Sequence, residues 1–281
     1  MAVRGWLWVG ICLAGLAATG ARAAAPPTYP PDIRRIIDRG TLIVAMTAGN
    51  LAPFHSYRDG RLTGVDVALA KGLAKALGVT VTYDMSAKSF DGVIDQVADG
   101  KADIGISKLS RNLSRARRVL FSHPYVKLHH AMAINRFWLT KATRNHSLAT
   151  VIRDFTGRVG VIAHSAFVGY AHQAMPHADI VGYPTWADVV QALATNKVTA
   201  IYREALSIKE MVRVDPALAL KVRTVDLVDY TDNVCMALGP NEFHLLHLVN
   251  IYLDGLHLHL TATALLQRDI EEARIGREGR P

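Results

Sequence analysis

Two residues of opposite charge, Lys108 and Glu204, occupy equivalent places in this chain of 281 residues. Each directly follows a short run of residues with the character of a buried strand, and 204 minus 108 is 96. An ammonium and a carboxylate that face each other can bridge directly, or each can hold an opposite charge on a bound ligand. We favour the second arrangement, because a pair that is already bridged would bind a charged ligand poorly. With Lys108 holding a second carboxylate, the pair predicts a preference for an acidic ligand.

Histidine could supply a different chemistry, since the chain has 12 of these residues. They include the neighbours His129 and His130 and the spaced pair His257 and His259. Strand-like spacing would place the last two on one face, but no carboxylate or cysteine joins them to complete a metal site. We therefore expect the spaced pair on a helix surface and predict no metal ion.

The residues before Lys108 have the pattern of alternating strands and helices. Apolar residues recur every four positions in GVDVALAKGLAKALG, at Val65, Leu69, Leu73 and Leu77. This spacing predicts a helix that Gly78 ends, and the apolar runs 42–46 and 79–83 predict strands on either side. A strand–helix–strand order is typical of a parallel sheet.

A second copy of this kind of unit lies 96 residues farther along. The segment FDGVIDQVADGKADIGIS, from Phe90, matches WADVVQALATNKVTAIYR, from Trp186. Gly100 and Asn196, the residues that best tolerate the end of a helix, also correspond. Any two helix–turn–strand units share some likeness, but a true repeat predicts two similar α/β lobes. Ligands of open parallel sheets lie beyond the carboxyl ends of the strands, so Lys108 would face Glu204 across a cleft.

Composition excludes several other classes of protein. Half of the residues are hydrophobic, which allows a large core. The net charge of +8 is spread along the chain without a basic block, which disfavours a nucleic-acid partner. The 2 cysteines cannot form a disulfide scaffold.

The first 25 residues read as a cleavable export signal. Arg4 precedes an apolar run over 6–18, and Ala21-Arg22-Ala23 supplies a small-x-small cleavage site. The apolar run is shorter than the ~20 residues that a membrane-spanning helix needs, which disfavours an anchor. Cleavage would leave Cys235 alone, so we expect a soluble protein in the periplasm without an intramolecular disulfide.

Four stretches in order carry a resemblance to a known family: GTLIVAMTAGNLAPF, GVDVALAKGLAKALG, SFDGVIDQVADGKADIGISKLSRNLSRARRVLFSHPY and GRVGVIAHSAFVGY. They resemble the periplasmic solute-binding proteins of family 3, the amino-acid-binding components of ABC transporters. The resemblance implies a type II periplasmic binding protein fold, with two parallel-sheet α/β lobes joined by two crossing strands. By that likeness, lobe one comprises 36–127 plus 229–265, lobe two comprises 128–228, and 266–281 form a C-terminal tail.

The resemblance also implies a set of ligand-binding residues. Arg115 matches an arginine that grips a ligand carboxylate, which suits the two-pronged geometry of a guanidinium. Ser110 matches a small hydroxyl residue that donates to the same carboxylate, and Phe90 matches a ring that packs on the ligand. Ser165 begins a helix of lobe two, where free N–H groups attract an anion. Leu51 stands where many relatives carry an aromatic residue.

Other positions depart from the family pattern. Ala48 replaces an Asp of many relatives, and Ala166 replaces a usual Thr. Glu204 occupies the place of the Asp that holds a ligand ammonium, and Lys108 occupies a place that is normally Gly, Ser or Thr. The residues that would bind the ligand carboxylate are thus retained, whereas those that would bind the rest of an amino acid are altered. We expect Tyr125 to belong to the hinge.

These inferences favour a binding protein, a monomer that captures a small carboxylate or amino-acid ligand and delivers it to the membrane permease of an ABC transporter. An acidic amino acid or a dicarboxylate fits the added lysine. Two alternatives stay open, a ligand-sensing module and a dehydratase-like enzyme on the same fold. For the enzyme, Glu204 and His164 offer a general acid or base, but no nucleophile–base motif accompanies them. No nucleic acid, metal or cofactor is expected.

Overall fold

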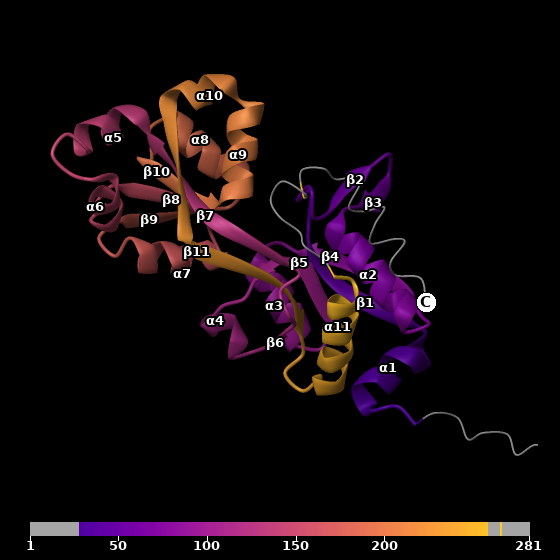
Figure 1. Ribbon diagram of the computed structural model, residues 1–281. Helices are drawn as coiled ribbons and strands as arrows, with labels where there is room; N and C mark the ends of the chain where they lie inside the picture. Colours follow the sequence, from indigo (N-terminus) through magenta and orange to yellow (C-terminus); the bar gives the residue numbers. More distant parts are fainter. Residues whose placement is uncertain (1–27, 258–264, 266–281) are drawn as a thin grey trace, which may run out of the picture.

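The structure is a computed structural model that describes residues 28–257 and Leu265. These residues form two α/β lobes joined by two long strands (Figure 1). Within the described residues, no helix is both long and apolar enough to cross a membrane. The predicted signal at 1–25 and the predicted tail at 266–281 lie outside the described residues.

Lobe one holds a sheet in which β1 lies between β4 and β5, with both pairings parallel. The α2 helix covers this sheet with the predicted apolar stripe, since Val65, Leu69 and Leu73 are almost fully buried. The elements of this lobe are α1 (Pro31–Arg39), β1 (Thr41–Thr47), β2 (Ser56–Arg58), β3 (Arg61–Thr63), α2 (Val65–Ala76), β4 (Thr80–Ala87), α3 (Phe90–Ala98), β5 (Ile104–Ser110), α4 (Leu113–Ala116), β6 (Leu120–Phe121) and α11 (Phe243–Gly255).

Lobe two repeats the arrangement, with β8 between β9 and β10 and both pairings parallel. It has its own core, which includes the fully buried side chains of Phe155, Val159 and Tyr202. Its elements are α5 (Arg136–Ala142), α6 (Leu148–Arg153), β8 (Arg158–Ile162), α7 (Ala166–Ala174), β9 (Asp179–Tyr183), α8 (Trp186–Ala194), β10 (Ala200–Glu204), α9 (Ala205–Val214) and α10 (Pro216–Lys221).

Two strands connect the lobes, β7 (Val126–Asn135) and β11 (Val222–Leu238). They pair antiparallel, and Figure 1 shows them running side by side from one lobe to the other. The register of the pair shifts between Leu227 and Thr231. The fold predicted from the sequence, two parallel-sheet lobes with two crossing strands, is therefore confirmed. The predicted lobe boundaries at 127/128 and 228/229 fall within these strands and stay a prediction.

The helices of the two units that match at an offset of 96, α3 and α8, begin and end alike. Ser89 caps α3 and Thr185 caps α8, each by accepting a backbone N–H three residues farther along. Gly100 and Asn196 both adopt a left-handed backbone, with φ of 70° and 57°. The prediction that Lys108 and Glu204 each follow a strand was wrong. β5 does not end at Ser107 but continues through Ser110, so Lys108 lies inside the strand, at an irregularity of its pairing with β11. Glu204 is the last residue of β10, which was predicted to end at Arg203.

Candidate functional site

A pocket lies between the lobes, at the ends of β5 and β10. We call it the cleft pocket, and it is lined by Phe90, Lys108, Ser110, Arg115, Ile162, Ser165, Ala166, Phe167, Tyr202, Arg203 and Glu204. The empty volume between these atoms, its opening included, is about 330 Å³. Six of the seven predicted site residues line the pocket. Leu51 does not, because it turns back to form a β-bridge with His55.

Lys108 crosses the cleft with its side chain only 4% exposed. Its Nζ lies 2.5 Å from Glu204 Oε1 and 5.5 Å from the centre of the Phe54 ring. The Lys108 backbone has a φ of 48°, a left-handed conformation that non-glycine residues rarely adopt. The buried Asp66 holds it there, because its Oδ2 accepts the Lys108 N–H at 2.9 Å.

Asp66 serves a second residue that the sequence analysis assigned to the hinge. Its Oδ1 accepts a hydrogen bond of 2.7 Å from the hydroxyl of Tyr125. Tyr125 stands immediately before β7 and is buried, so it joins the first hinge strand to the backbone of Lys108. It does not line the cleft pocket.

Glu204 is fully buried at the start of α9, and both of its oxygens have donors. Oε1 accepts from Lys108 and from the Ser207 hydroxyl, and Oε2 accepts from Arg203 Nε at 3.1 Å. Burial opposes the charged form, but the charges of Arg203 and Lys108 win and lower the pKa of Glu204 to about 2. The carboxylate is therefore ionised at neutral pH.

Lys108 keeps its charge as well. Burial, together with the charge of Arg203, lowers the pKa of the Lys108 ammonium to about 8, while Glu204 acts in the opposite direction. At pH 7 most of the ammonium is still protonated. The two residues thus form a buried ion pair from lobe to lobe.

This pair corrects our preference for an arrangement in which each charge meets the ligand. The physical reason is desolvation, because a buried charge without a partner is costly and the partner across the cleft is within reach. Arg203, the third charge of the cluster, is also buried and stacks 4.7 Å from the Trp186 ring.

Arg115 lies in α4 with its side chain 5% exposed. Its Nε and Nη2 donate to Asp91 Oδ1 at 2.9 and 2.8 Å, and its Nη1 donates to the Ser110 carbonyl at 3.0 Å. Asn112 caps the short helix by accepting the Arg115 backbone N–H. A guanidinium has five N–H groups, so within the described residues two remain for a further acceptor.

Ser110 does not present a free hydroxyl to the pocket. Its Oγ donates to Asp232 Oδ2 at 2.9 Å, and Asp232 lies fully buried on the hinge strand β11. Burial raises the pKa of Asp232 to about 7, although the hydrogen bond from Ser110 opposes this. Among the described residues, Asp232 Oδ1 has no hydrogen-bond partner. Once Asp232 is protonated it can donate to Ser110, which frees the serine hydrogen for an anion in the pocket.

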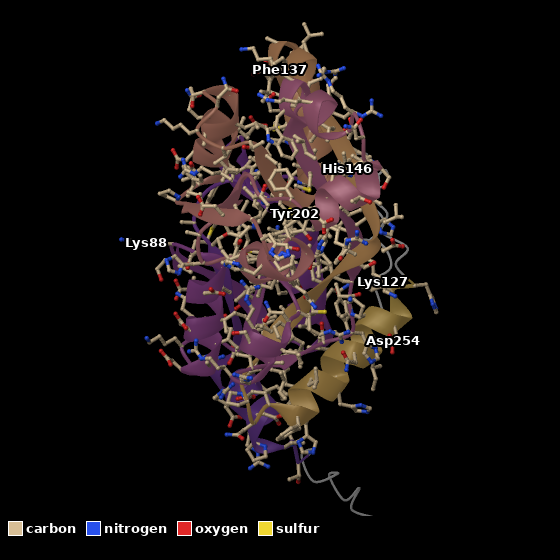
Figure 2. All side chains as sticks on the ribbon, turned by 90° about the vertical axis from the view of Figure 1, so that its left-hand side faces the viewer. Lys88, Lys127, Phe137, His146, Tyr202 and Asp254 are labelled. Atoms are coloured by element: carbon tan, nitrogen blue, oxygen red, sulfur yellow. The ribbon has the colours of Figure 1, made fainter. Side chains whose placement is uncertain are left out.

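Lobe two contributes an apolar and aromatic wall. Ser165 is the N-cap residue of α7, but its side chain accepts no capping hydrogen bond. Its hydroxyl instead donates to the Ile162 carbonyl at 2.6 Å. The rings of Phe167 and Tyr202 lie with centres 5.6 Å apart beside it. Tyr202 is near the middle of the molecule, in contrast to Phe137 at the outer end of lobe two (Figure 2). Phe90, half-buried at the start of α3, faces this wall from lobe one.

Two further contacts join the lobes near the pocket. The Asp91 backbone N–H donates to the His164 carbonyl at 3.3 Å. The Tyr170 hydroxyl donates to the Arg111 carbonyl at 3.1 Å. With the Lys108–Glu204 pair, they hold the cleft closed.

The histidines do not assemble a metal site in the described part of the chain, which contains no group of three or more metal-binding side chains. His130 is buried on β7, where its Nδ1 contacts the Tyr202 hydroxyl, and burial lowers its pKa to about 4. His257 is exposed just after α11, and His259 lies outside the described residues.

Sequence reasoning missed several residues that shape the site. Besides Asp66, Phe167 and Tyr202, they are Asp91, Arg203, Asp232 and Phe54. Two of them had a signal, because Asp91 follows Phe90 at the helix start and Arg203 directly precedes Glu204. Asp232 is the last of three acidic residues in β11, after Asp226 and Asp229, and it precedes the apolar run VCMAL. This position indicates burial only once β11 is known to cross between the lobes. Phe54 lies in a loop whose path no local pattern specifies.

Comparison with known proteins relates part of the chain to one family. Residues 43–137 match the bacterial extracellular solute-binding proteins, family 3. It is 28% identical over 172 residues to a probable histidine-binding protein of Campylobacter jejuni, a match that covers 61% of this chain and 63% of that protein. It is 36% identical over 118 residues to a cyclohexadienyl dehydratase of Pseudomonas aeruginosa, a match covering 41% of either protein.

Solved structures show the same fold over more of the chain. An ancestral amino-acid-binding protein, described as a precursor of cyclohexadienyl dehydratase, superposes with a TM-score of 0.64 at 25% identity and covers 84% of this chain and 97% of its own. An arginine-bound ABC transporter substrate-binding protein of Streptococcus pneumoniae gives a TM-score of 0.67 at 23% identity, over 88% and 98%. The chain thus has the two-lobed fold of these amino-acid-binding proteins.

Proposed function

We propose that this protein belongs to the family 3 solute-binding proteins and works outside the cytoplasm, where it captures a small carboxylate ligand between its lobes and delivers it to an ABC-type permease. The observation that carries the proposal is Arg115, a buried guanidinium at the wall of the cleft pocket with two N–H groups to spare. A guanidinium in that position suits a carboxylate, which it can hold with two parallel hydrogen bonds.

The charges around the pocket support an anionic ligand. Three buried cations, Lys108, Arg115 and Arg203, surround it. Glu204 balances one of them, and Asp91, 45% exposed, balances another. With its pKa raised by burial to about 7, Asp232 is only partly ionised at neutral pH. The remaining excess is positive, which favours a ligand with at least one negative charge.

The architecture supports capture rather than turnover. Each lobe has its own buried core, and two extended strands connect them, so a hinge motion can open and close the cleft without unfolding either lobe. Closure excludes water and strengthens every charged contact inside. Three of the four relatives named above are binding proteins, and delivery to a permease follows from that likeness.

A thermal-shift screen of amino acids and other small carboxylic acids tests the proposal. A ligand at a hundred times its dissociation constant adds about 2.7 kcal/mol to the free energy of unfolding, a clear shift in melting temperature. We expect stabilisation by at least one carboxylate, and loss of that stabilisation in Arg115→Ala. The matched control is Arg117→Ala, which removes an exposed arginine from the same segment.

One relative is an enzyme, so the screen includes prephenate with a spectroscopic assay for its conversion. We expect no turnover. Conversion of prephenate that depends on Glu204 would contradict the proposal and identify the protein as a lyase. Failure of every carboxylate to stabilise the protein would contradict capture in the cleft.

A further inference from the structure

The Lys108 ammonium lies in surroundings that would suit the ammonium of a ligand. A carboxylate oxygen of Glu204 is 2.5 Å away, and the face of the Phe54 ring is 5.5 Å away. A carboxylate and an aromatic face together are the usual partners of a bound ammonium group. In this protein the group that occupies these surroundings belongs to the chain itself.

The carboxylate of Glu204 has little remaining capacity to bind a second cation. Its two oxygens already accept hydrogen bonds from Lys108, Ser207 and Arg203. A ligand ammonium in the cleft pocket would meet Lys108 and Arg203 together with Arg115, and like charges in a dry cleft repel strongly. Asp91 does not relieve this, since it is bound to Arg115 and is not among the residues that line the pocket.

The backbone of Lys108 is held so that its side chain reaches across the cleft. Asp66 accepts the Lys108 N–H, and the left-handed φ of 48° is kept although a lysine side chain disfavours it. A glycine would adopt this backbone without strain. A lysine kept at such a position, with its ammonium buried, points to a role for the ammonium.

We propose that Lys108 fills the ammonium position of the cleft, so that the ligand is a carboxylate without an ammonium group, such as a 2-oxo acid, a 2-hydroxy acid or a dicarboxylate. This inference rests on the proposed capture of a carboxylate in the same cleft. Arg115 holds the carboxylate, and the rings of Phe90, Phe167 and Tyr202 pack against the rest of the ligand. Lys108 is thus the residue that determines specificity against amino acids, which the named relatives bind.

Ligands that differ only at the second carbon test this directly. The probes are phenylalanine, phenylpyruvate and phenyllactate, and glutamate, 2-oxoglutarate and 2-hydroxyglutarate, each titrated calorimetrically at pH 7. We expect the wild-type protein to bind an oxo or hydroxy acid at least tenfold more tightly than the matching amino acid. In Lys108→Gly, which suits the backbone and frees Glu204 Oε1, we expect that preference to fall at least tenfold. Lys101→Ser, which removes an exposed lysine, is the control and keeps the wild-type ranking.

The possible results separate the two proposals. If the wild-type protein binds an amino acid as tightly as its oxo and hydroxy counterparts, the inference about Lys108 is overturned while carboxylate capture stands. If Lys108→Gly keeps the wild-type ranking, Lys108 does not set the specificity. If no member of either set and no other carboxylate binds the wild-type protein, capture itself is wrong and the inference fails with it. The wild-type ranking needs no variant, so the test survives if Lys108→Gly does not fold.

Discussion

The ion pair between the lobes should have a large coupling energy, which a double-mutant cycle on Lys108 and Glu204 measures. At 2.5 Å and an effective dielectric constant of about 20, the attraction between the two charges is about 7 kcal/mol before desolvation is subtracted. Glu204→Gln leaves Lys108 and Arg203 buried without a counter-charge and should cost about 3–5 kcal/mol of stability. Lys108→Met should cost less, because Arg203 and Ser207 still satisfy the carboxylate.

The double variant should cost less than the sum of the two single variants. We expect a coupling energy of about 2–3 kcal/mol, typical of close pairs that share a buried network. Urea unfolding followed by fluorescence and by circular dichroism supplies the four free energies, and agreement of the two probes checks two-state behaviour. The control cycle uses Lys101 and Asp99, which pair at 3.1 Å but are 66% and 51% exposed. That pair should couple by no more than about 0.5 kcal/mol.

The cycle can refute the account of the site. A Lys108–Glu204 coupling energy as small as that of the surface pair would mean that the two side chains do not meet in solution. The ammonium position would then be open to a ligand, and the reasoning on specificity would lose its basis.

Three further predictions concern stability and export. Burial raises the pKa of Asp232 from 3.8 to about 7, so the wild-type protein loses stability as the pH rises through this range. The free energy of unfolding that Asp232→Asn gains should therefore grow between pH 4 and pH 8, to at most about 4 kcal/mol. A gain that does not depend on pH would contradict the burial of this carboxyl group. Gly64→Ala should lower the free energy of unfolding by about 3 kcal/mol or more, because its Cβ would lie 2.2 Å from a backbone oxygen at a φ of 122°. In the same urea titration, Gly169→Ala should be neutral or stabilising, because Gly169 is in an open helical position. Mass spectrometry of protein from the periplasm should show a start near Ala23 or Ala25, and an intact N-terminal methionine would contradict an export signal.

The fold was predictable because its signals are local and periodic. The apolar stripe of α2, the buried run of β1 and the alternating, half-buried run of β4 are visible within a few residues of sequence, and the structure places them as expected. The offset of 96 also placed Lys108 and Glu204 on opposite sides of one cleft, because the equivalent strands β5 and β10 begin at equivalent places, Ile104 and Ala200.

The contacts inside the site were less predictable. Whether Lys108 meets Glu204 or a ligand depends on how far the lobes close, and no local pattern encodes that distance. The Arg115–Asp91 pair spans 24 residues and forms only once α3 and α4 lie side by side. Leu51 was assigned to the site by likeness alone, but its β-bridge with His55 keeps it out of the pocket lining.

Calorimetric titration of the best carboxylate from the screen into wild-type protein, Arg115→Ala and Arg117→Ala tests the central claim most directly. Loss of a buried partner for a ligand charge typically costs about 3–5 kcal/mol, so Arg115→Ala should weaken binding at least a hundredfold, while Arg117→Ala binds like the wild type. Circular dichroism should show that both variants keep the fold. Equal affinity of Arg115→Ala and the wild-type protein would contradict a carboxylate-binding cleft.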